Sequence, residues 1–184
     1  MKKVSFWSRK GGVGKTTLAL NVAAAAVNKG LKVAYVDIDS QGSALWLSEL
    51  GKLPFDVLKK APSKGYDLCI YDYPPNTEIK IEGKIVVVPY QPAALDIGAT
   101  LKYIPTLKDQ GFKVIEVINM VKNRADPKAY ALKQTKKGAL QVNDRSIYQR
   151  VTSYGTTVFN ADFSSKYGTK NARNEINKIL EAIL

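Results

Sequence analysis

Short apolar runs alternate with longer amphipathic stretches along this chain. Helical spacing of apolar residues predicts a helix over Thr17–Asn28, closed by Gly30, which suits a left-handed C-terminal position. The apolar runs are nearly continuous and rich in β-branched and aromatic residues, as in strands buried on both faces of a sheet. The alternation predicts an α/β fold with a doubly wound, mostly parallel sheet and helices on both faces. The predicted strands are Val4–Trp7, Val33–Val36, Leu68–Tyr71, Ile85–Val88 and Val114–Ile118.

The last predicted helix covers about Asn171 to Leu184. We expect its apolar face to pack against the sheet. The alternative is a membrane-binding tail, which its polar face disfavours because that face mixes basic and acidic residues. The apolar face is expected to contain Ile176, Ile179, Leu180, Ile183 and Leu184.

Length and composition predict a single domain over residues 1–184. The chain runs from Met1-Lys2-Lys3 into the first predicted strand, so we expect no secretory signal. No apolar stretch approaches the roughly 18 to 20 residues that span a bilayer. The expected location is therefore the cytoplasm.

The cysteine and histidine content limits the catalytic groups and metal sites that this chain can form. Cys69 lies within an apolar run, so a buried strand position is favoured over a reactive thiol. With one cysteine and no histidine, the chain cannot form an internal disulfide, a serine–histidine pair or a histidine-ligated zinc site. Acid–base or metal chemistry would fall to carboxylates, lysines and hydroxyls, which suits magnesium and phosphate.

A glycine-rich loop follows the first predicted strand and precedes the first helix. Glycines there allow backbone N–H groups to converge on phosphate oxygens. Lys15 is expected to reach the β- and γ-phosphates, the Thr16 hydroxyl to bind Mg²⁺, and Thr17 to contact the α-phosphate. The usual pattern has glycine at position 9, where this chain has Arg9 followed by Lys10. The predicted nucleotide-binding residues are Gly11, Gly12, Val13, Gly14, Lys15, Thr16 and Thr17.

Carboxylates follow the next two apolar runs. Asp37 and Asp39 come after the second predicted strand, on the same side of an extended segment. One could orient the magnesium shell and the other the attacking water; the alternative is that they cap a turn. The third run ends at Asp72, the arrangement that presents a Walker B carboxylate to magnesium, and Pro74-Pro75 follow. A loop there could sense the γ-phosphate.

Positive charge is concentrated late in the chain. The net charge is +12, and residues 122–150 contain eight basic residues against two acidic ones, half of that excess. A basic surface of this kind favours a polyanionic partner, with DNA the natural candidate, although any single residue could be ordinary solvated charge. Tyr148 and Tyr154 lie among these charges and could touch DNA or be buried. The predicted DNA-binding residues are Lys133, Lys136, Lys137, Arg145 and Arg150.

Together these segments resemble the ParA/MinD family of deviant Walker P-loop ATPases, most closely the small ParA proteins that partition DNA. The resemblance covers nearly the whole chain. Two segments are weaker matches, Val86–Pro92 and Gly155–Phe159. Ser40 departs from the proline common in the family, and we expect no helix-turn-helix region ahead of the first strand. The specific matches are Lys10–Thr17, Val36–Gln41 and Leu68–Pro75.

The resemblance implies roles that the residues alone do not. Lys10 would be the signature lysine that reaches across an ATP-bound sandwich homodimer to the partner's phosphates. Asp39 would position the hydrolytic water, and Asp37 would support the magnesium shell. Asn119, expected at the end of the fifth strand, would contact adenine. The catalytic set would be Lys10, Lys15 and Asp39, with Thr16, Asp37 and Asp72 at the metal.

The sequence thus predicts a slow, Mg²⁺-dependent ATPase of the ParA type. Its ATP-bound dimer would bind nucleoid DNA non-specifically, and a centromere-binding partner would stimulate hydrolysis. The main alternative is a MinD-like positioning ATPase on a membrane or protein scaffold. A metabolic enzyme on the same loop, such as an ATP-dependent ligase or a reductase component, is a further alternative. The single cysteine argues against the reductase.

Overall fold

The computed structural model describes residues 1–75, 81–93, 98 and 100–184. These residues form a seven-stranded sheet with the order β3-β2-β4-β1-β5-β6-β7. Every pair of neighbouring strands is parallel, which confirms the predicted fold class. The strands are β1 Lys2–Phe6, β2 Val33–Asp37, β3 Asp56–Leu58, β4 Leu68–Asp72, β5 Ile85–Tyr90, β6 Lys113–Val121 and β7 Leu140–Asn143.

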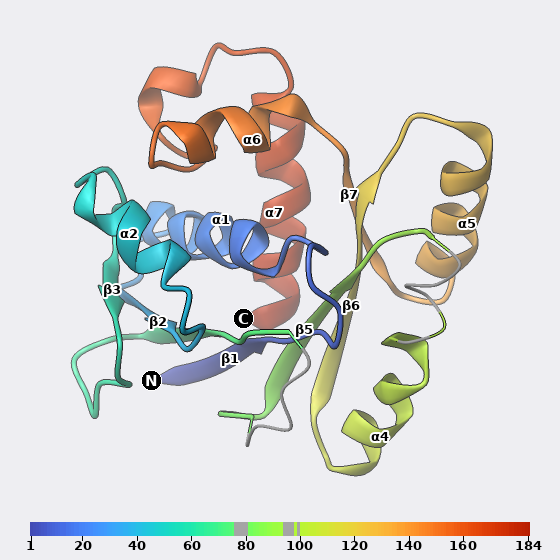
Figure 1. Ribbon diagram of the computed structural model, residues 1–184, viewed down its shortest axis with the longest axis horizontal. Coiled ribbons are helices and arrows are strands. Elements are labelled where there is room, and N and C mark those ends of the chain that lie inside the picture. Colours follow the sequence, from blue (N-terminus) through green and yellow to red (C-terminus); the bar gives the residue numbers. More distant parts are fainter. Residues whose placement is uncertain (76–80, 94–97, 99) are drawn as a thin grey trace.

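Helices cover both faces of this sheet. Figure 1 shows α1 and α7 together on one side of the sheet, with α4 and α5 on the other side. A short 3₁₀ helix, Ala161–Phe163, precedes α7. The α-helices with printed bounds are α1 Lys15–Asn28, α2 Ser43–Glu49, α4 Tyr103–Asp109, α5 Ala125–Thr135, α6 Ser146–Ser153 and α7 Thr169–Ile183.

The five predicted strands are confirmed, and two edge strands were missed. The missed strands are β3, which has three residues, and β7, which has four. Neither contains a continuous apolar run, so the apolar pattern gave no signal for them. The edge position explains this, because an edge strand needs fewer buried residues than a central one.

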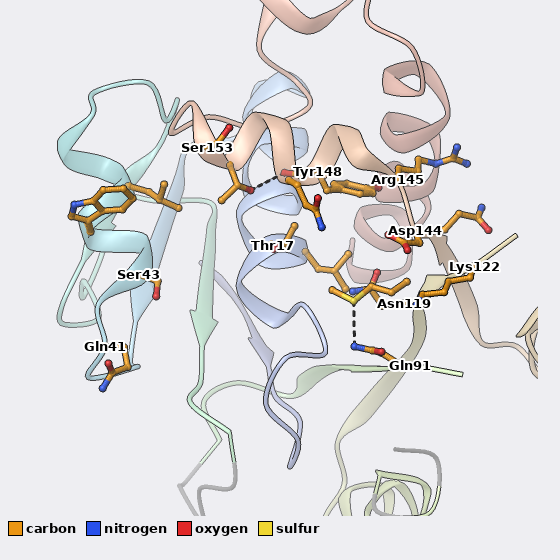
Figure 2. Close-up of a pocket in the computed structure, with 17 residues that line it drawn as sticks. Thr17, Gln41, Ser43, Gln91, Asn119, Lys122, Asp144, Arg145, Tyr148 and Ser153 are labelled. Atoms are coloured by element: carbon orange, nitrogen blue, oxygen red, sulfur yellow. Dashed lines mark hydrogen bonds between the residues drawn. The ribbon is translucent and has the colours of Figure 1, made fainter. Parts of the chain in front are cut away.

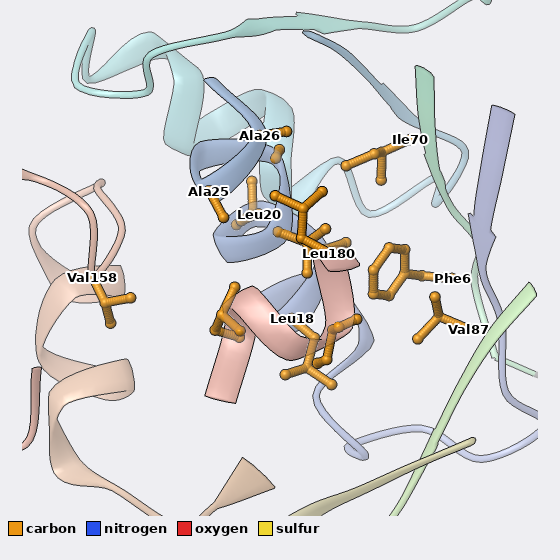
Figure 3. Close-up of a cluster of buried hydrophobic side chains, with 14 of the residues drawn as sticks. Phe6, Leu18, Leu20, Ala25, Ala26, Ile70, Val87, Val158 and Leu180 are labelled. Atoms are coloured by element: carbon orange, nitrogen blue, oxygen red, sulfur yellow. The ribbon is translucent and has the colours of Figure 1, made fainter. Parts of the chain in front are cut away.

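The core divides into layers that follow the alternation of side chains along the strands. In β2, Val33 and Tyr35 belong to the large cluster that contains α1 and α7, while Ala34 and Val36 belong to the cluster that contains α4. Figure 3 shows Leu18 of α1 and Leu180 of α7 close to Phe6 and Val87 of the sheet. Successive residues of a strand point to opposite faces, so both faces of the central strands are buried.

Helix α7 confirms the predicted packing except at its last residue. Ile176, Ile179, Leu180 and Ile183 are fully buried in the large core cluster. Leu184, predicted on the same face, lies beyond the helix and is 52% exposed. Because the apolar face is inside the core, the alternative of a membrane-binding tail is wrong. No helix among the described residues is long and apolar enough to cross a bilayer.

Cys69 is fully buried in β4, as predicted for a strand residue. Burial raises the pKa of its thiol, which keeps the sulfur protonated and unreactive. The structure therefore favours the packing interpretation of this cysteine.

Candidate functional site

The glycine-rich loop connects the carboxyl end of β1 to the start of α1. Gly12 and Gly14 have positive φ angles, 73° and 86°. At Gly14 a Cβ atom would also lie 2.3 Å from Nδ2 of Asn119, so both conformation and space require glycine. Helix α1 begins at Lys15, and its unpaired N–H groups therefore open toward the loop. This is an anion-binding geometry.

Two amide side chains brace the loop, one from the residue just beyond β5 and one from β6. Asn119 donates from Nδ2 to the carbonyl of Val13 at 2.8 Å, and Gln91 donates from Nε2 to the carbonyl of Gly12 at 3.0 Å. Both bonds hold carbonyl oxygens of the loop. Sequence reasoning missed Gln91, and the one available signal was its place in the weaker family-like segment Val86–Pro92.

Asn119 lies inside β6 and is 4% exposed, so the expectation that it ends the strand is wrong. The expected fifth strand is also sixth in chain order, because β3 precedes it. Met120, the next residue, has a positive φ of 55°, and the pairing of β6 with β7 shifts register here. This distortion allows Asn119 to reach the loop from within a strand. Its contact with adenine stays a prediction.

Lys15 is buried at the centre of the loop, with 7% of its surface exposed. Its Nζ donates to the carbonyl of Lys10 at 3.4 Å. Burial lowers the pKa of Lys15, while the nearby carboxylates of Asp72 and Asp39 oppose this effect. A desolvated ammonium group that makes a long hydrogen bond gains strongly from an added anion. Lys10, in contrast, is exposed at the rim of the loop.

Strand register brings the carboxylates to the same edge of the sheet. Asp72 of β4 pairs with Phe6 of β1 on one side and with Asp37 of β2 on the other. The end of β1 leads into the loop, so Asp72 lies beside it. Its Oδ2 accepts hydrogen bonds from the Thr16 hydroxyl at 2.6 Å and from the Tyr35 hydroxyl at 2.8 Å.

The second oxygen of Asp72 shows whether the residues here fit a metal ion. Oδ1 is buried and has no hydrogen-bond partner among the described residues. Burial raises the pKa of Asp72 to about 6, although the Thr16 and Tyr35 hydroxyls act to lower it. A buried carboxylate oxygen beside a threonine hydroxyl fits Mg²⁺, which binds through one or two protein oxygens plus phosphate and water. The residues present therefore fit this metal.

Asp37 and Asp39 differ in how their carboxylates are used. Asp37 is buried, and its carboxylate accepts hydrogen bonds from the backbone N–H groups of Asp39, Ala44 and Leu45. These bonds agree with the alternative interpretation, in which the carboxylate caps backbone N–H groups, here in the turn before α2 and at the start of that helix. Asp39 is half-buried and accepts one bond, from the N–H of Gln41 at 3.0 Å. The geometry thus leaves Asp39 better placed for chemistry than Asp37, whose role at the metal stays a prediction.

Arg9 stacks on the aromatic ring of the first residue of α4. Its guanidinium carbon lies 4.1 Å from the centre of the Tyr103 ring, and that ring lies 5.6 Å from the ring of Trp7. A cation–π contact of this kind contributes about 0.5–2 kcal/mol. The residue that replaces the usual first glycine therefore ties the loop to the first turn of α4.

A cavity of about 880 Å³ opens beside the loop. Figure 2 shows Thr17 of α1 between Gln41 and Ser43 on one side and Asn119, Lys122 and Asp144 on the other, with α6 above. Its volume falls in the range of small-molecule sites, about 300–1,000 Å³. Its lining includes residues that no motif indicated, among them Trp46, Met120, Asp144, Tyr148 and Thr152.

The predicted DNA-binding residues lie on different elements of the fold. Lys133 lies on α5 and Lys136 and Lys137 follow it, all exposed, whereas Arg150 lies on α6. Arg145 forms an ion pair with Glu175 of α7 at 2.6 Å, with 22% of the Arg145 side chain exposed. Its charge is locally neutralised, although DNA binding by all five residues stays a prediction.

The two tyrosines of this segment also differ. Tyr148 is 8% exposed and its hydroxyl donates to the carbonyl of Ala172, so the burial alternative holds for it. Tyr154 is 53% exposed and packs edge-on against Phe163. The loop expected to sense the γ-phosphate lies partly outside the described residues, which end at Pro75 on this side and resume at Ile81.

Comparison with known proteins places this geometry in a family. The model of the CobQ/CobB/MinD/ParA nucleotide-binding domain matches residues 4–165. The maintenance of carboxysome distribution protein A of Gloeobacter kilaueensis is 36% identical over 55% of this chain and 54% of its own length. The protein of the same name from Halothiobacillus neapolitanus is 24% identical over 95% of this chain and 93% of its own length.

Solved structures share the fold. McdA of Cyanothece in complex with ATP superimposes with a TM-score of 0.73 at 15% identity, covering 100% of this chain and 96% of that one. MinD of Pyrococcus furiosus gives 0.72 at 18% identity, covering 98% of both chains. A plasmid partition protein of Borrelia burgdorferi gives 0.69 at 16% identity, also covering 98% of both. The chain therefore belongs to the CobQ/CobB/MinD/ParA nucleotide-binding family and has the fold of its ParA and MinD ATPases.

Proposed function

We propose that this protein is a ParA-type partition ATPase, a single domain over residues 1–184. The observation that carries the proposal is a pair of buried, oppositely charged groups at the loop. Lys15 is a desolvated cation, and Asp72 has a buried oxygen without a partner among the described residues. A magnesium–nucleotide would satisfy both at once, because its phosphates are anionic and its metal takes oxygen ligands. An ordinary structural loop would have no need of this arrangement.

The proposed roles follow from where the residues lie. The loop's N–H groups and Lys15 bind the phosphates, and the nucleoside extends past Thr17 into the adjacent cavity, where Asn119 meets the adenine. Thr16 and Asp72 hold Mg²⁺, which neutralises phosphate charge when bound. Asp39 orients the attacking water, as its freer carboxylate allows.

Lys10 is proposed to act between subunits. It is exposed at the rim of the loop, and its backbone carbonyl accepts the hydrogen bond from Lys15. A second copy of the chain could therefore present its phosphates to this ammonium, so that ATP holds two subunits together. Loss of the γ-phosphate would weaken the contact between the two subunits, so the rate of hydrolysis would set the lifetime of the dimer.

DNA is the proposed ligand of the ATP-bound dimer. Lys133, Lys136 and Lys137 are exposed at and beyond the end of α5, and none forms an ion pair within the described part of the chain. A dimer would carry two copies of this cluster, and phosphate contacts from both would add to the affinity. Association with the nucleoid, and a centromere-binding partner that stimulates hydrolysis, complete the proposal.

The test of this function is binding to random-sequence duplex DNA, measured by fluorescence anisotropy with Mg²⁺ and ATP, with Mg²⁺ and ADP, and without nucleotide. We expect DNA binding with Mg²⁺ and ATP but not in the other two conditions. The affinity for DNA should fall steeply as the salt concentration rises. A parallel titration with a neutral polymer of similar length controls for crowding. Equal DNA binding with ATP and ADP would refute the nucleotide switch.

A second candidate function is the distribution of a protein body inside the cell. It is favoured by the two relatives that carry the name of a carboxysome distribution protein. The two candidates differ in the cargo and in the partner that would stimulate hydrolysis. A MinD-like role on a membrane is the further alternative. Sedimentation with anionic liposomes and ATP separates it from both, since only a membrane-associated ATPase would pellet.

A further inference from the structure

A buried tyrosine on β2 holds the Walker B carboxylate. Tyr35 is fully buried, and its hydroxyl donates to Oδ2 of Asp72 at 2.8 Å. The Thr16 hydroxyl donates to the same oxygen at 2.6 Å. Two donors from different elements, α1 and β2, therefore converge on one carboxylate oxygen, while Oδ1 has no hydrogen-bond partner among the described residues.

The second donor fixes the direction of the carboxylate. The terminal torsion of aspartate is broad, so a carboxylate held by a single hydrogen bond can pivot about that bond. Bonds from Thr16 on one side and Tyr35 on the other restrict this rotation. Oδ1 then keeps one orientation, and a metal ion approaching Asp72 meets a pre-aligned ligand instead of a rotating one.

The tyrosine ring is itself held in place. It stacks on Phe55 with ring centres 5.9 Å apart and planes inclined by 23°. Its backbone lies in the interior of β2, paired with β4 on one side and β3 on the other. An unpaired hydroxyl at this depth would cost free energy, so the bond to Asp72 also satisfies Tyr35.

We propose that Tyr35 is a positioning residue for the magnesium–nucleotide site, acting through Asp72. The inference rests on the proposed function, because it takes Thr16 and Asp72 as the magnesium ligands. Its consequence is specific: Tyr35 supports the part of nucleotide affinity that depends on Mg²⁺, and contributes little to the part that the glycine loop supplies.

The test compares Tyr35→Phe with Tyr71→Phe. Tyr35→Phe keeps the ring on Phe55 and removes only the hydroxyl. Tyr71→Phe removes a buried hydroxyl from the residue just before Asp72. The Tyr71 side chain points to the opposite face of the sheet from Tyr35 and packs in the cluster with α4. Calorimetry measures the affinity of each protein for ATP, once with Mg²⁺ and once with EDTA. Thermal melts with and without Mg²⁺ and ATP give a second readout.

We expect Tyr35→Phe to lower the affinity for ATP with Mg²⁺ by about tenfold, with a change within about twofold in EDTA. The melting-temperature rise given by Mg²⁺ and ATP should shrink in parallel. Tyr71→Phe should leave the Mg²⁺ dependence at its wild-type value. Equal losses with and without Mg²⁺, or no loss with Mg²⁺, would overturn the role of Tyr35. A wild-type protein whose ATP affinity ignores Mg²⁺ would instead refute the proposed metal site.

Discussion

The loop edge of the sheet and the basic segment at residues 122–150 are built in opposite ways. At the loop edge, charged side chains are buried and partly unsatisfied, as Lys15 and Asp72 show. In the basic segment most charges are exposed to solvent, whereas Arg145 is partly buried and paired with Glu175. Buried polar groups cost free energy unless a ligand repays it, whereas solvated lysines cost little. The loop edge therefore indicates function residue by residue, and the basic segment only as a group.

The largest expected effect is at the buried cation of the loop. Replacing Lys15 by alanine removes the ammonium group nearest the expected phosphates, so affinity for ATP should fall by at least about 100-fold. Lys29→Ala is the matched control, because Lys29 follows the other end of α1 and is exposed beside Glu181. Calorimetry with Mg²⁺ and ATP should find the control unchanged. Comparable losses in both variants would mean that the loop edge is not special.

The basic segment should show a smaller, collective effect. Removing the exposed charges of Lys133, Lys136 and Lys137 together should lower ATP-dependent DNA affinity by roughly tenfold and flatten its salt dependence, with ATP binding unchanged. Arg145→Ala should act differently: it removes the cation paired with Glu175, which then keeps its hydrogen bonds from Asn143, and should lower the free energy of unfolding by about 1–3 kcal/mol. Anisotropy and chemical denaturation measure the two. If only Arg145→Ala lowered the affinity for DNA, the assignment of DNA binding to the three lysines and of a structural role to Arg145 would be wrong.

The pH dependence of stability sharpens the contrast further. Asp72 has a pKa raised to about 6, so the ligand-free native state holds this proton more tightly than the unfolded chain does. The stability due to this group therefore falls as the pH rises from about 4 to about 6, and the cost, on the order of 3 kcal/mol, persists above that window. Asp72→Asn cannot ionise. At pH 7.5 it should melt above the wild type, and near pH 4 the two should melt together.

The matched control for this pH effect is Tyr71→Phe, at the residue just before Asp72 on the same strand. Burial raises the pKa of the Tyr71 hydroxyl, so this group stays protonated and its melting difference from wild type should not change sign or grow between pH 4 and pH 7.5. A pH-independent difference for Asp72→Asn would contradict the buried, ionised carboxylate.

The same contrast explains what the sequence could predict. The loop, its lysine and the ends of β1, β2 and β4 were predictable because their geometry is local: a strand, glycines and a helix follow one another. Contacts between distant residues were not. Tyr35 on Asp72 and Arg9 on Tyr103 join separate elements, and no spacing in the chain encodes them. The distribution of the basic segment could not be predicted for a related reason, since α5 and α6 place residues that are close in sequence in different parts of the molecule.

The central claim is that ATP at the loop joins two copies of the chain. Light scattering after gel filtration measures this directly, using Asp39→Ala to prevent turnover. With Mg²⁺ and ATP this variant should have twice the monomer mass of 20.2 kDa, and with ADP the monomer mass itself. Adding Lys10→Ala should restore the monomer in ATP. A mass of one chain in ATP, under conditions where calorimetry shows the nucleotide bound, would contradict the account.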